Sequence, residues 1–454
     1  MAARGRHPLH SPGKDMSMRV HDLIGIGFGP SNLALAIALD EQRRAGRPLV
    51  DALFIERQPG FAWHPDMLLS QSHMQISFLK DLATLRNPTS RFTFVNYLHQ
   101  QGRLPDFINL KTFYPSRREF NDYLGWAAAQ FDDSCVYGEE VVEVLPQLQG
   151  REVHDREVHN REMHNREVQL LRVRSRDAAG QWHERLARHL VVSIGGTANI
   201  PEAFRALKGD PRVMHSSGYL AGLARQPDAQ RIAIIGAGQS AAELFMDLHG
   251  RPNAPCVDLV MRARAIRPAD DSPFVNEIFN AGFVDQVYAQ PEAQRAELLQ
   301  AFRHTNYACA DQDLIRQMFA VFYEQRVSGD ERHRFLRRHE IQSVRAAPDG
   351  IHLNLLDVGA SRERSQRYDA VVLATGYARE QHHALLGGLA PWLGRLQVDR
   401  DYRVIAPREF RPAVFLQGAC ETTHGLSDTL LSITAVRSNE IAANLATLNA
   451  NNSH

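Results

Sequence analysis

Cysteine is scarce in this sequence, and no cysteine has a close partner along the chain. The four cysteines are Cys135, Cys256, Cys309 and Cys420 in a chain of 454 residues. No CxxC or CxxxxC pair occurs, so the sequence predicts neither a zinc site nor a dithiol redox centre. Scattered, unpaired thiols fit a reducing compartment, and we therefore expect a cytoplasmic protein.

The sequence also lacks a charge surplus, a long apolar run and the apolar segment of a secretory signal. Lysine and arginine together number 52, and aspartate and glutamate also number 52. Without a basic surplus, nucleic acid is not an expected partner. No apolar run is long enough to cross a bilayer, so no transmembrane segment is expected. Residues 1–20 are polar, which argues against a secretory signal; we expect a disordered tail, with a transit peptide as the alternative.

A glycine-rich turn near the start of the chain is the first feature that indicates chemistry. Gly25, Gly27 and Gly29 follow a short apolar run, and residues 32–39 have the composition of a helix. Such a strand–turn–helix binds a dinucleotide pyrophosphate, because glycines admit the phosphates and the helix N-terminus supplies free N–H groups. Pro30 breaks the usual GxGxxG pattern, so a purely structural turn is the alternative at this point.

A second turn of the same kind occurs halfway along the chain. Residues 231–235 are apolar and strand-like, and Gly236 and Gly238 then open a GxGxxA pattern that leads into a helix. Two such turns predict two nucleotide-binding folds and therefore two bound nucleotides.

The strand that follows each turn ends in a residue of different charge. Glu56 directly follows the apolar residues 53–55, whereas Arg262 directly follows the stretch 257–261. An acid at this position pairs with a free ribose hydroxyl, and an arginine accommodates a 2′-phosphate. We therefore assign FAD to the first site and NADPH to the second. A generic basic rim is the alternative explanation for the arginine.

An unusual repeat separates two expected strands. Residues 151–168 repeat Arg-Glu-Val-His or a close variant with a period of five. This period accumulates no apolar face on a helix, and it flips the faces of a strand at each repeat. We interpret the repeat as a solvated insertion, and we expect no physiological metal site at its histidines.

Six longer segments resemble one known family. They are 24–39, 61–82, GAGQSAAE at 236–243, RPADDSPFVNEIFN at 267–280, LATGY at 373–377 and HGLSDTLLS at 424–432. In this order they resemble the microbial N-hydroxylating flavin monooxygenases, specifically the L-ornithine hydroxylases of siderophore biosynthesis. The resemblance extends over roughly residues 20–445. Pro30 matches the family's own version of the first turn.

The resemblance implies an α/β fold with two Rossmann-like domains and a small helical substrate region. The FAD domain is expected at 21–203 and 368–454, and the NADPH domain at 204–367, with the substrate region at about 268–330. The buried strand 370–373 is expected to return the chain to the first sheet. A homotetramer is also implied.

The resemblance also assigns roles to particular residues. Lys80 resembles the lysine that pairs with the substrate carboxylate, and Asn276 and Asn306 resemble the asparagines that hold its α-amino and carboxyl ends. The other expected contacts are Gln75 and Ser432 in the substrate pocket; Gly25, Gly27, Gly29, Pro30, Ser31, Glu56, Trp63, His64 and Gln75 for FAD; and Gly236, Gly238, Gln239, Ser240 and Arg262 for NADPH. Gln239 is expected to position flavin and nicotinamide, and no side chain is expected to act as nucleophile or acid–base catalyst.

The implied reaction uses NADPH, FAD and O₂ to hydroxylate the side-chain amine of L-ornithine through a hydroperoxide at flavin C4a. The nearest alternative is an L-lysine hydroxylase, whose substrate is longer by one methylene. A hydrophobic pocket distinguishes one methylene by only about 1–3 kcal/mol. A disulfide reductase requires the cysteine pair that is missing, and a Baeyer–Villiger enzyme favours ketones over amines. A non-catalytic, redox-sensing NADPH-binding protein would fit a chain without flavin, or one whose reduced flavin never meets a substrate, whereas both nucleotide sites look intact here.

Overall fold

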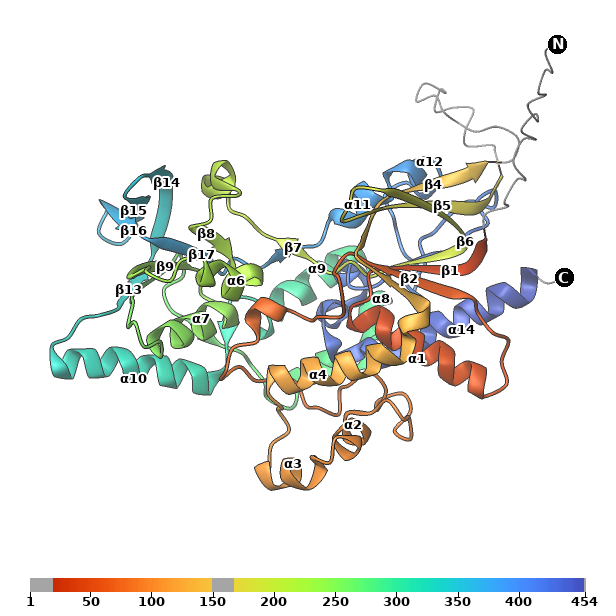
Figure 1. Ribbon diagram of the computed structural model, residues 1–454, viewed down its shortest axis with the longest axis horizontal. Helices are drawn as coiled ribbons and strands as arrows, with labels where there is room; N and C mark the ends of the chain where they lie inside the picture. Colours follow the sequence, from red (N-terminus) through yellow and green to blue (C-terminus); the bar gives the residue numbers. More distant parts are fainter. Residues whose placement is uncertain (1–18, 149–166, 453–454) are drawn as a thin grey trace, which may run out of the picture.

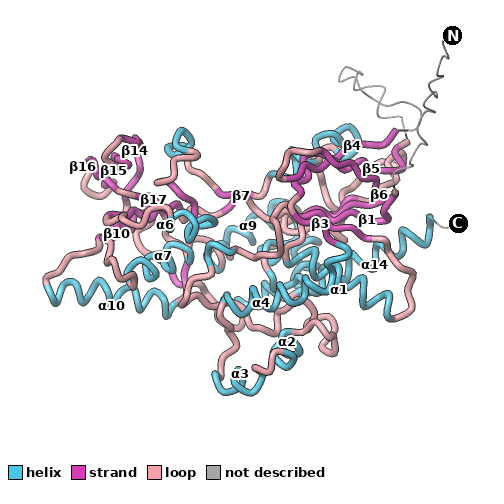
Figure 2. Tube along the Cα trace, in the orientation of Figure 1, coloured by secondary structure: helices cyan, strands magenta, loops and turns pink. Residues whose placement is uncertain are grey.

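The computed structural model describes residues 19–148 and 167–452, and it is built around two β-sheets. Strands gather at opposite ends of the long axis, with helices and loops between them (Figure 2). The predicted tail, 1–20, lies outside the described residues except for positions 19 and 20. The predicted repeat insertion, 151–168, lies outside them except for positions 167 and 168. No helix in the described part of the chain is long and apolar enough to cross a membrane.

The first sheet contains seven strands in the order β3-β2-β1-β6-β5-β4, with β19 also paired to β6. Its strands are β1 (Val20–Ile26), β2 (Ala52–Glu56), β3 (Cys135–Tyr137), β4 (Glu139–Leu148), β5 (Val168–Asp177), β6 (Trp182–Val192) and β19 (Val414–Leu416). The pairs among β1, β2, β3, β6 and β19 are parallel, whereas β4 and β5 pair antiparallel. The order β3-β2-β1-β6 is that of a dinucleotide-binding fold.

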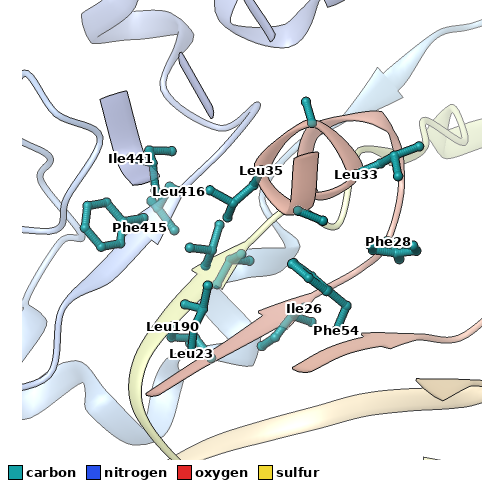
Figure 3. Close-up of a cluster of buried hydrophobic side chains, with 14 of the residues drawn as sticks. Leu23, Ile26, Phe28, Leu33, Leu35, Phe54, Leu190, Phe415, Leu416 and Ile441 are labelled. Carbon is teal, nitrogen blue, oxygen red and sulfur yellow. The ribbon is translucent and has the colours of Figure 1, made fainter. Parts of the chain in front are cut away.

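Helices cover the face of this sheet that Figure 1 shows below it. They are α1 (Pro30–Arg44), α4 (Arg117–Ala128) and α14 (Thr434–Asn452), with α2 (Phe94–Gln100) and α3 (Leu104–Leu110) beneath α4. Leu33, Leu35 and Ile37 of α1 are all fully buried, within a stretch of the helix that is buried on every side. They belong to one apolar cluster with strand residues such as Leu23 and Leu190, and Figure 3 shows Leu33 and Leu35 in this cluster.

The second sheet contains five strands in the order β13-β10-β9-β17-β8, and all of its pairs are parallel. Its strands are β8 (Val213–His215), β9 (Arg231–Ile235), β10 (Cys256–Met261), β13 (Arg334–Arg337) and β17 (Ala370–Leu373). The helices α6 (Tyr219–Ala224), α7 (Gln239–His249) and α10 (Gln312–Ser328) lie beside this sheet (Figure 1).

The position of β17 corrects one prediction. We expected residues 370–373 to return the chain to the first sheet, but β17 pairs with β9 and β8 in the second. The return is made by β19, which pairs with the carboxyl end of β6. A short, fully buried strand has the same composition in either sheet, so its sequence did not specify its partners.

Smaller elements complete the fold. A three-stranded antiparallel sheet is formed by β14 (His339–Ala347), β15 (Gly350–Asp357) and β16 (Arg362–Tyr368). Two-stranded pairs are formed by β11 (Arg267–Pro268) with β12 (Cys309–Ala310), and by β7 (Thr197–Ala198) with β18 (Tyr377–Ala378). The helices α11 (Gln381–Leu385) and α12 (Ala390–Leu393) lie beside β4 (Figure 1).

The predicted helical region is divided between two neighbours. The helices α8 (Ala281–Tyr288) and α9 (Glu292–Ala301) pack against α13 (Glu421–His424), which follows β19 of the first sheet. The later helix α10 packs instead on α7 of the second sheet. The segment that begins near residue 268 therefore connects the two halves of the molecule.

Candidate active site

The two nucleotide turns face one large cleft between the halves of the molecule. Its volume is about 3630 Å³, and both sheets contribute residues to its wall. Parallel strands place their carboxyl ends at the same edge, and the turns that follow them form the binding crevice of such folds. With the exception of Gly25, every predicted site residue lines this cleft.

The three glycines of the first turn have different structural roles. Gly27 has a φ of +81°, and a Cβ there would lie 2.6 Å from the carbonyl oxygen of Ser193. A Cβ at Gly29 would meet no heavy atom within 4 Å, so the chain leaves open space above the start of α1. Gly25 does not line the cleft, because its α-carbon faces the Phe54 ring at a hypothetical Cβ distance of 2.4 Å. The structure gives Gly25 a packing role beneath the turn.

Pro30 is the first residue of α1, with Gly29 as its N-cap. Proline is well suited to this position, because its fixed φ matches the helix and the missing N–H has no intrahelical partner there. The next two N–H groups, of Ser31 and Asn32, also lack intrahelical partners. The open space above Gly29 and these N–H groups fit a pyrophosphate at the helix N-terminus.

Glu56 lies at the carboxyl end of β2, and its carboxylate is held by the backbone. One carboxylate oxygen accepts a hydrogen bond from the Phe28 amide at 2.7 Å, and the other accepts one from the Gln58 amide at 2.9 Å. Glu56 is mostly buried but still lines the cleft. Each oxygen retains a lone pair, so the fixed carboxylate is able to accept hydrogen bonds from ribose hydroxyls.

The second turn repeats the close approach of backbone to backbone. Gly236 has a φ of +152°, and a Cβ there would lie 2.3 Å from the carbonyl oxygen of Ala374. Gly238 is the N-cap of α7, and Gln239 and Ser240 form its first turn at the wall of the cleft. Arg262 follows β10, and it is exposed to the cleft as expected for a phosphate contact.

Gln239 is held in one orientation by two neighbours. Its side-chain Nε2 donates to Glu243 Oε1 at 2.7 Å, and its Oε1 accepts the Asp311 amide at 2.8 Å. Glu243 in turn forms two hydrogen bonds of 2.8 Å with the guanidinium of Arg117, which begins α4 beside the first sheet. Burial raises the pKa of Glu243 above its usual range, and the charge of Arg117 opposes that rise.

Lys80 is a half-buried cation in the wall of the same cleft. Within residues 19–148 and 167–452, no hydrogen-bond or ion-pair partner is found for its amine. Burial lowers the pKa of Lys80 below its ordinary value, because the charged form loses solvation without gaining a counter-ion. The side chain is therefore suited to receive a carboxylate from a ligand.

The remaining predicted substrate residues come from separate parts of the chain. Gln75 lies in the loop before Lys80, Asn276 and Asn306 flank α8 and α9, and Ser432 precedes α14. Asn276 donates its side-chain amide to the Asp271 carbonyl at 2.7 Å, which leaves its Oδ1 for a ligand. Trp63 and His64, predicted for FAD, form an edge-to-face ring pair in the wall.

Several residues important to the site were missed by the sequence analysis. Asn32 is fully buried; its amide donates to Gly27 O at 2.7 Å, and its oxygen accepts from Ser193 at 3.0 Å and Gln417 at 3.1 Å. It therefore ties the first turn to β6 and β19. Arg117 was also missed, because a lone arginine carries no sequence signal for a partner 126 positions away.

No cluster of three or more potential metal-ligating side chains occurs in the part of the chain that the structure describes. Two Rossmann-type turns that open onto one cleft, one followed by a carboxylate and the other by an arginine, define a flavoprotein oxidoreductase that uses FAD and NADPH.

The chain belongs to the L-lysine 6-monooxygenase/L-ornithine 5-monooxygenase family, whose model matches residues 19–379. The L-ornithine N(5)-monooxygenase of Pseudomonas aeruginosa is 49% identical over 430 residues, which cover 94% of this chain and 94% of that protein. These matches confirm the family resemblance predicted from the sequence.

Solved structures agree with this assignment. An ornithine hydroxylase from Pseudomonas aeruginosa superimposes with a TM-score of 0.88 at 48% identity, covering 95% of this chain and 100% of that one. An ornithine N-hydroxylase from Kutzneria sp. 744, described with reduced FAD, NADP⁺ and L-ornithine, gives 0.85 at 35% identity and covers 94% and 99% of the two chains. The predicted α/β fold with two nucleotide domains is confirmed.

Proposed function

We propose that this protein is an FAD- and NADPH-dependent L-ornithine N5-monooxygenase, which hydroxylates the side-chain amine of L-ornithine with O₂. The observation that carries the proposal is one cleft that collects both nucleotide turns and Lys80, a half-buried cation for which the described residues supply no counter-ion. A nicotinamide, a flavin and an amino acid can therefore meet within this one cleft. FAD supplies the oxygen-activating chemistry when it is bound.

The residues of the first half hold the flavin in this proposal. The pyrophosphate lies over Gly27, Gly29, Pro30 and Ser31, and Glu56 accepts the ribose hydroxyls. Trp63, His64 and Gln75 form the wall against the ring system. In the second half, Gly236, Gly238, Ser240 and Arg262 bind NADPH, and Gln239 positions the nicotinamide against the flavin. Support comes from their common place in the cleft.

Lys80, Asn276 and Asn306 orient the amino-acid end of the substrate. The Lys80 ammonium pairs with the α-carboxylate, which compensates the solvation that its burial removes. The asparagines bind the α-amino and carboxyl groups, and Gln75 and Ser432 border the side chain. With one end fixed, the side-chain nitrogen points toward the flavin.

The reacting amine must be neutral to act as a nucleophile. A lysine-like amine has a solution pKa of about 10.4, so its deprotonation at pH 7 costs about 4.6 kcal/mol. A poorly solvated pocket supplies part of this by disfavouring the charged form. A carboxylate beside the nitrogen would oppose it, so we propose that Asp270, Asp271 and Glu277, which all line the cleft, lie away from that nitrogen.

The choice of ornithine over lysine, and the wider context, are parts of the same proposal. The relatives at about half identity are named as ornithine enzymes. The product is a hydroxylamine, the precursor of a hydroxamate, and we propose a role early in hydroxamate siderophore synthesis in the cytoplasm. No metal or nucleic acid takes part.

We also propose a homotetramer. The helix α10 exposes three apolar side chains spaced by four residues, Phe319, Tyr323 and Val327, at 68%, 60% and 65%. Residues at this spacing share one face of a helix, and an exposed apolar stripe of this kind favours a subunit interface. Light scattering on the purified protein gives the mass that tests this.

The test of the activity is hydroxylamine formation by the FAD-loaded protein with NADPH and O₂, compared between L-ornithine and L-lysine. Product with ornithine supports both reaction and substrate. Product with lysine alone would move the assignment to the lysine branch, and NADPH oxidation that gives only hydrogen peroxide with both would remove the amine substrate.

A further inference from the structure

A buried ion pair lies directly behind the first nucleotide turn. Arg437 on α14 is 1% exposed at its side chain and Asp428 is 0% exposed, and their Nη1 and Oδ1 atoms are 2.8 Å apart. The other carboxylate oxygen of Asp428 accepts the Cys420 amide at 2.6 Å. A buried pair of this kind is costly unless further hydrogen bonds fix its geometry. Asp428 and Arg437 both make such bonds, whereas the Nε of Arg437 has no hydrogen-bond partner among the described residues.

The second guanidinium nitrogen of Arg437 reaches the nucleotide turn itself. Its Nη2 donates to the hydroxyl oxygen of Ser31 at 2.9 Å, across 406 positions of sequence. Ser31 belongs to the first turn of α1 and lines the cleft. Arginine is a donor only, so the Ser31 oxygen is necessarily the acceptor in this contact.

This direction of hydrogen bonding fixes the role of the Ser31 proton. A hydroxyl has one proton to donate, and among the described residues no acceptor is found for that of Ser31. With its oxygen engaged by Arg437, the proton is free to point into the cleft. An anionic oxygen at the N-terminus of α1 is the group that such a donor fits.

We propose that Arg437 is a positioning residue for the flavin cofactor, which acts by making the Ser31 hydroxyl a donor to the FAD pyrophosphate. The Arg437 side chain is 1% exposed and borders the cleft, and we assign its effect on the cofactor to Ser31 rather than to a direct contact. Asp428 balances the charge of Arg437. Arg437 therefore aids FAD binding by orienting the Ser31 hydroxyl and not by attracting the pyrophosphate with a net positive charge. The proposal rests on FAD occupying the first turn.

The experiment measures the affinity of the full chain for FAD by flavin fluorescence, together with the unfolding temperature of the flavin-free protein. The variants are Ser31→Ala, Ser31→Thr, Arg437→Lys and the double variant S31A/R437K. Arg86→Lys is the matched control. The Arg86 side chain is 9% exposed and pairs with Glu41, which lies on α1 as Ser31 does. Neither Arg86 nor Glu41 lines the cleft.

Loss of one charge-assisted hydrogen bond weakens binding by about tenfold or more, which we expect for S31A. S31T keeps the hydroxyl and retains affinity. R437K also weakens FAD binding by about tenfold, because lysine does not span Asp428 and Ser31 in the same fork. Because Arg437 acts through Ser31, the double variant is no weaker than S31A. R86K lowers only the unfolding temperature.

Three results would overturn the proposal. They are an R437K protein that unfolds earlier but binds FAD normally, losses that multiply in the double variant, and an S31A protein with unchanged affinity. If R437K does not fold, the structure of the wild-type holoenzyme decides: Ser31 Oγ should contact both a phosphate oxygen and Arg437, and a Ser31 that faces away overturns the role. A wild-type chain that fails to bind FAD would contradict the cofactor assignment instead.

Discussion

Lys80 is the side chain whose environment most directly indicates a ligand. It is half-buried in the cleft without a counter-ion among the described residues. Replacing it by alanine should raise the KM for L-ornithine by about 10- to 150-fold, the value of a hydrogen bond between charged groups. FAD affinity should stay unchanged. The exposed Lys208, substituted by alanine, is the control, and a collapse of flavin binding in K80A would contradict the assigned role.

The pH dependence of substrate binding tests the same residue. Burial places the pKa of Lys80 below its ordinary value, so the free enzyme loses this cation at a lower pH than a solvated lysine does. The KM for ornithine should therefore rise as pH increases, starting below the usual lysine range. Lys80→Arg keeps its charge at these pH values and should remove that rise. An unchanged KM profile in K80R would show that another group titrates.

Substitution by alanine should affect folding stability differently at Gly27 and at Gly29 of the first turn. Gly27→Ala forces a positive φ on a residue with a side chain and meets the Ser193 carbonyl, so it should lower the unfolding temperature and impair folding. Gly29→Ala has a negative φ and open space, so its flavin-free protein should be as stable as wild type. FAD affinity should still fall, because the methyl group occupies the cofactor's place. Normal FAD binding by G29A would contradict the site.

The ion pair between Arg117 and Glu243 joins α4 to α7, and we expect its loss to lower the stability of the folded protein. Arg117→Met leaves Glu243 buried without its partner, which costs about 3–5 kcal/mol for a buried pair. Burial already raises the pKa of Glu243, and removal of Arg117 raises it further. The folded form then holds its proton more tightly than the unfolded form, so the loss should be largest above pH 7 and shrink toward pH 5. Thermal unfolding at both pH values measures this, and an equal loss at both would contradict it.

At the scale of elements, the sequence predicted what is local and missed what is distant. The strand–turn–helix units at 22–39 and 231–243 were evident, because glycine spacing and apolar runs are properties of neighbouring residues. The partners of β17 were not evident, because the sequence of a short, fully buried strand does not specify which sheet it joins. The contacts of Asn32 with Ser193 and Gln417 likewise depend on chain segments far apart in sequence.

The candidate site shows the same division. Gln239 was placed by its motif, but its orientation depends on Glu243 and on an arginine from the other half of the molecule. Lys80 alone is an ordinary lysine in sequence, and only the family resemblance singled it out. Only the fold shows that Lys80 is half-buried and has no counter-ion in the part of the chain that the structure describes, where loops from both halves line one cleft.

At the scale of the whole molecule, the two sheets stand at opposite ends (Figures 1 and 2), and residues that follow strands of both sheets line one cleft. The helices α8 and α9 reach from the second half to α13 of the first, so the predicted substrate residues come from both halves. A reductant, a flavin and an amine are thus brought together by the arrangement of the halves rather than by any one motif.

The central claim is that this cleft transfers oxygen from O₂ to the side-chain amine of ornithine. The most direct test is turnover of the FAD-loaded protein with NADPH and L-ornithine under ¹⁸O₂, with the product examined by mass spectrometry. The account predicts N5-hydroxyornithine that carries one ¹⁸O atom, and no product when either NADPH or FAD is omitted. Hydroxylated product without the label, or NADPH oxidation with no hydroxylated amino acid at all, would contradict it.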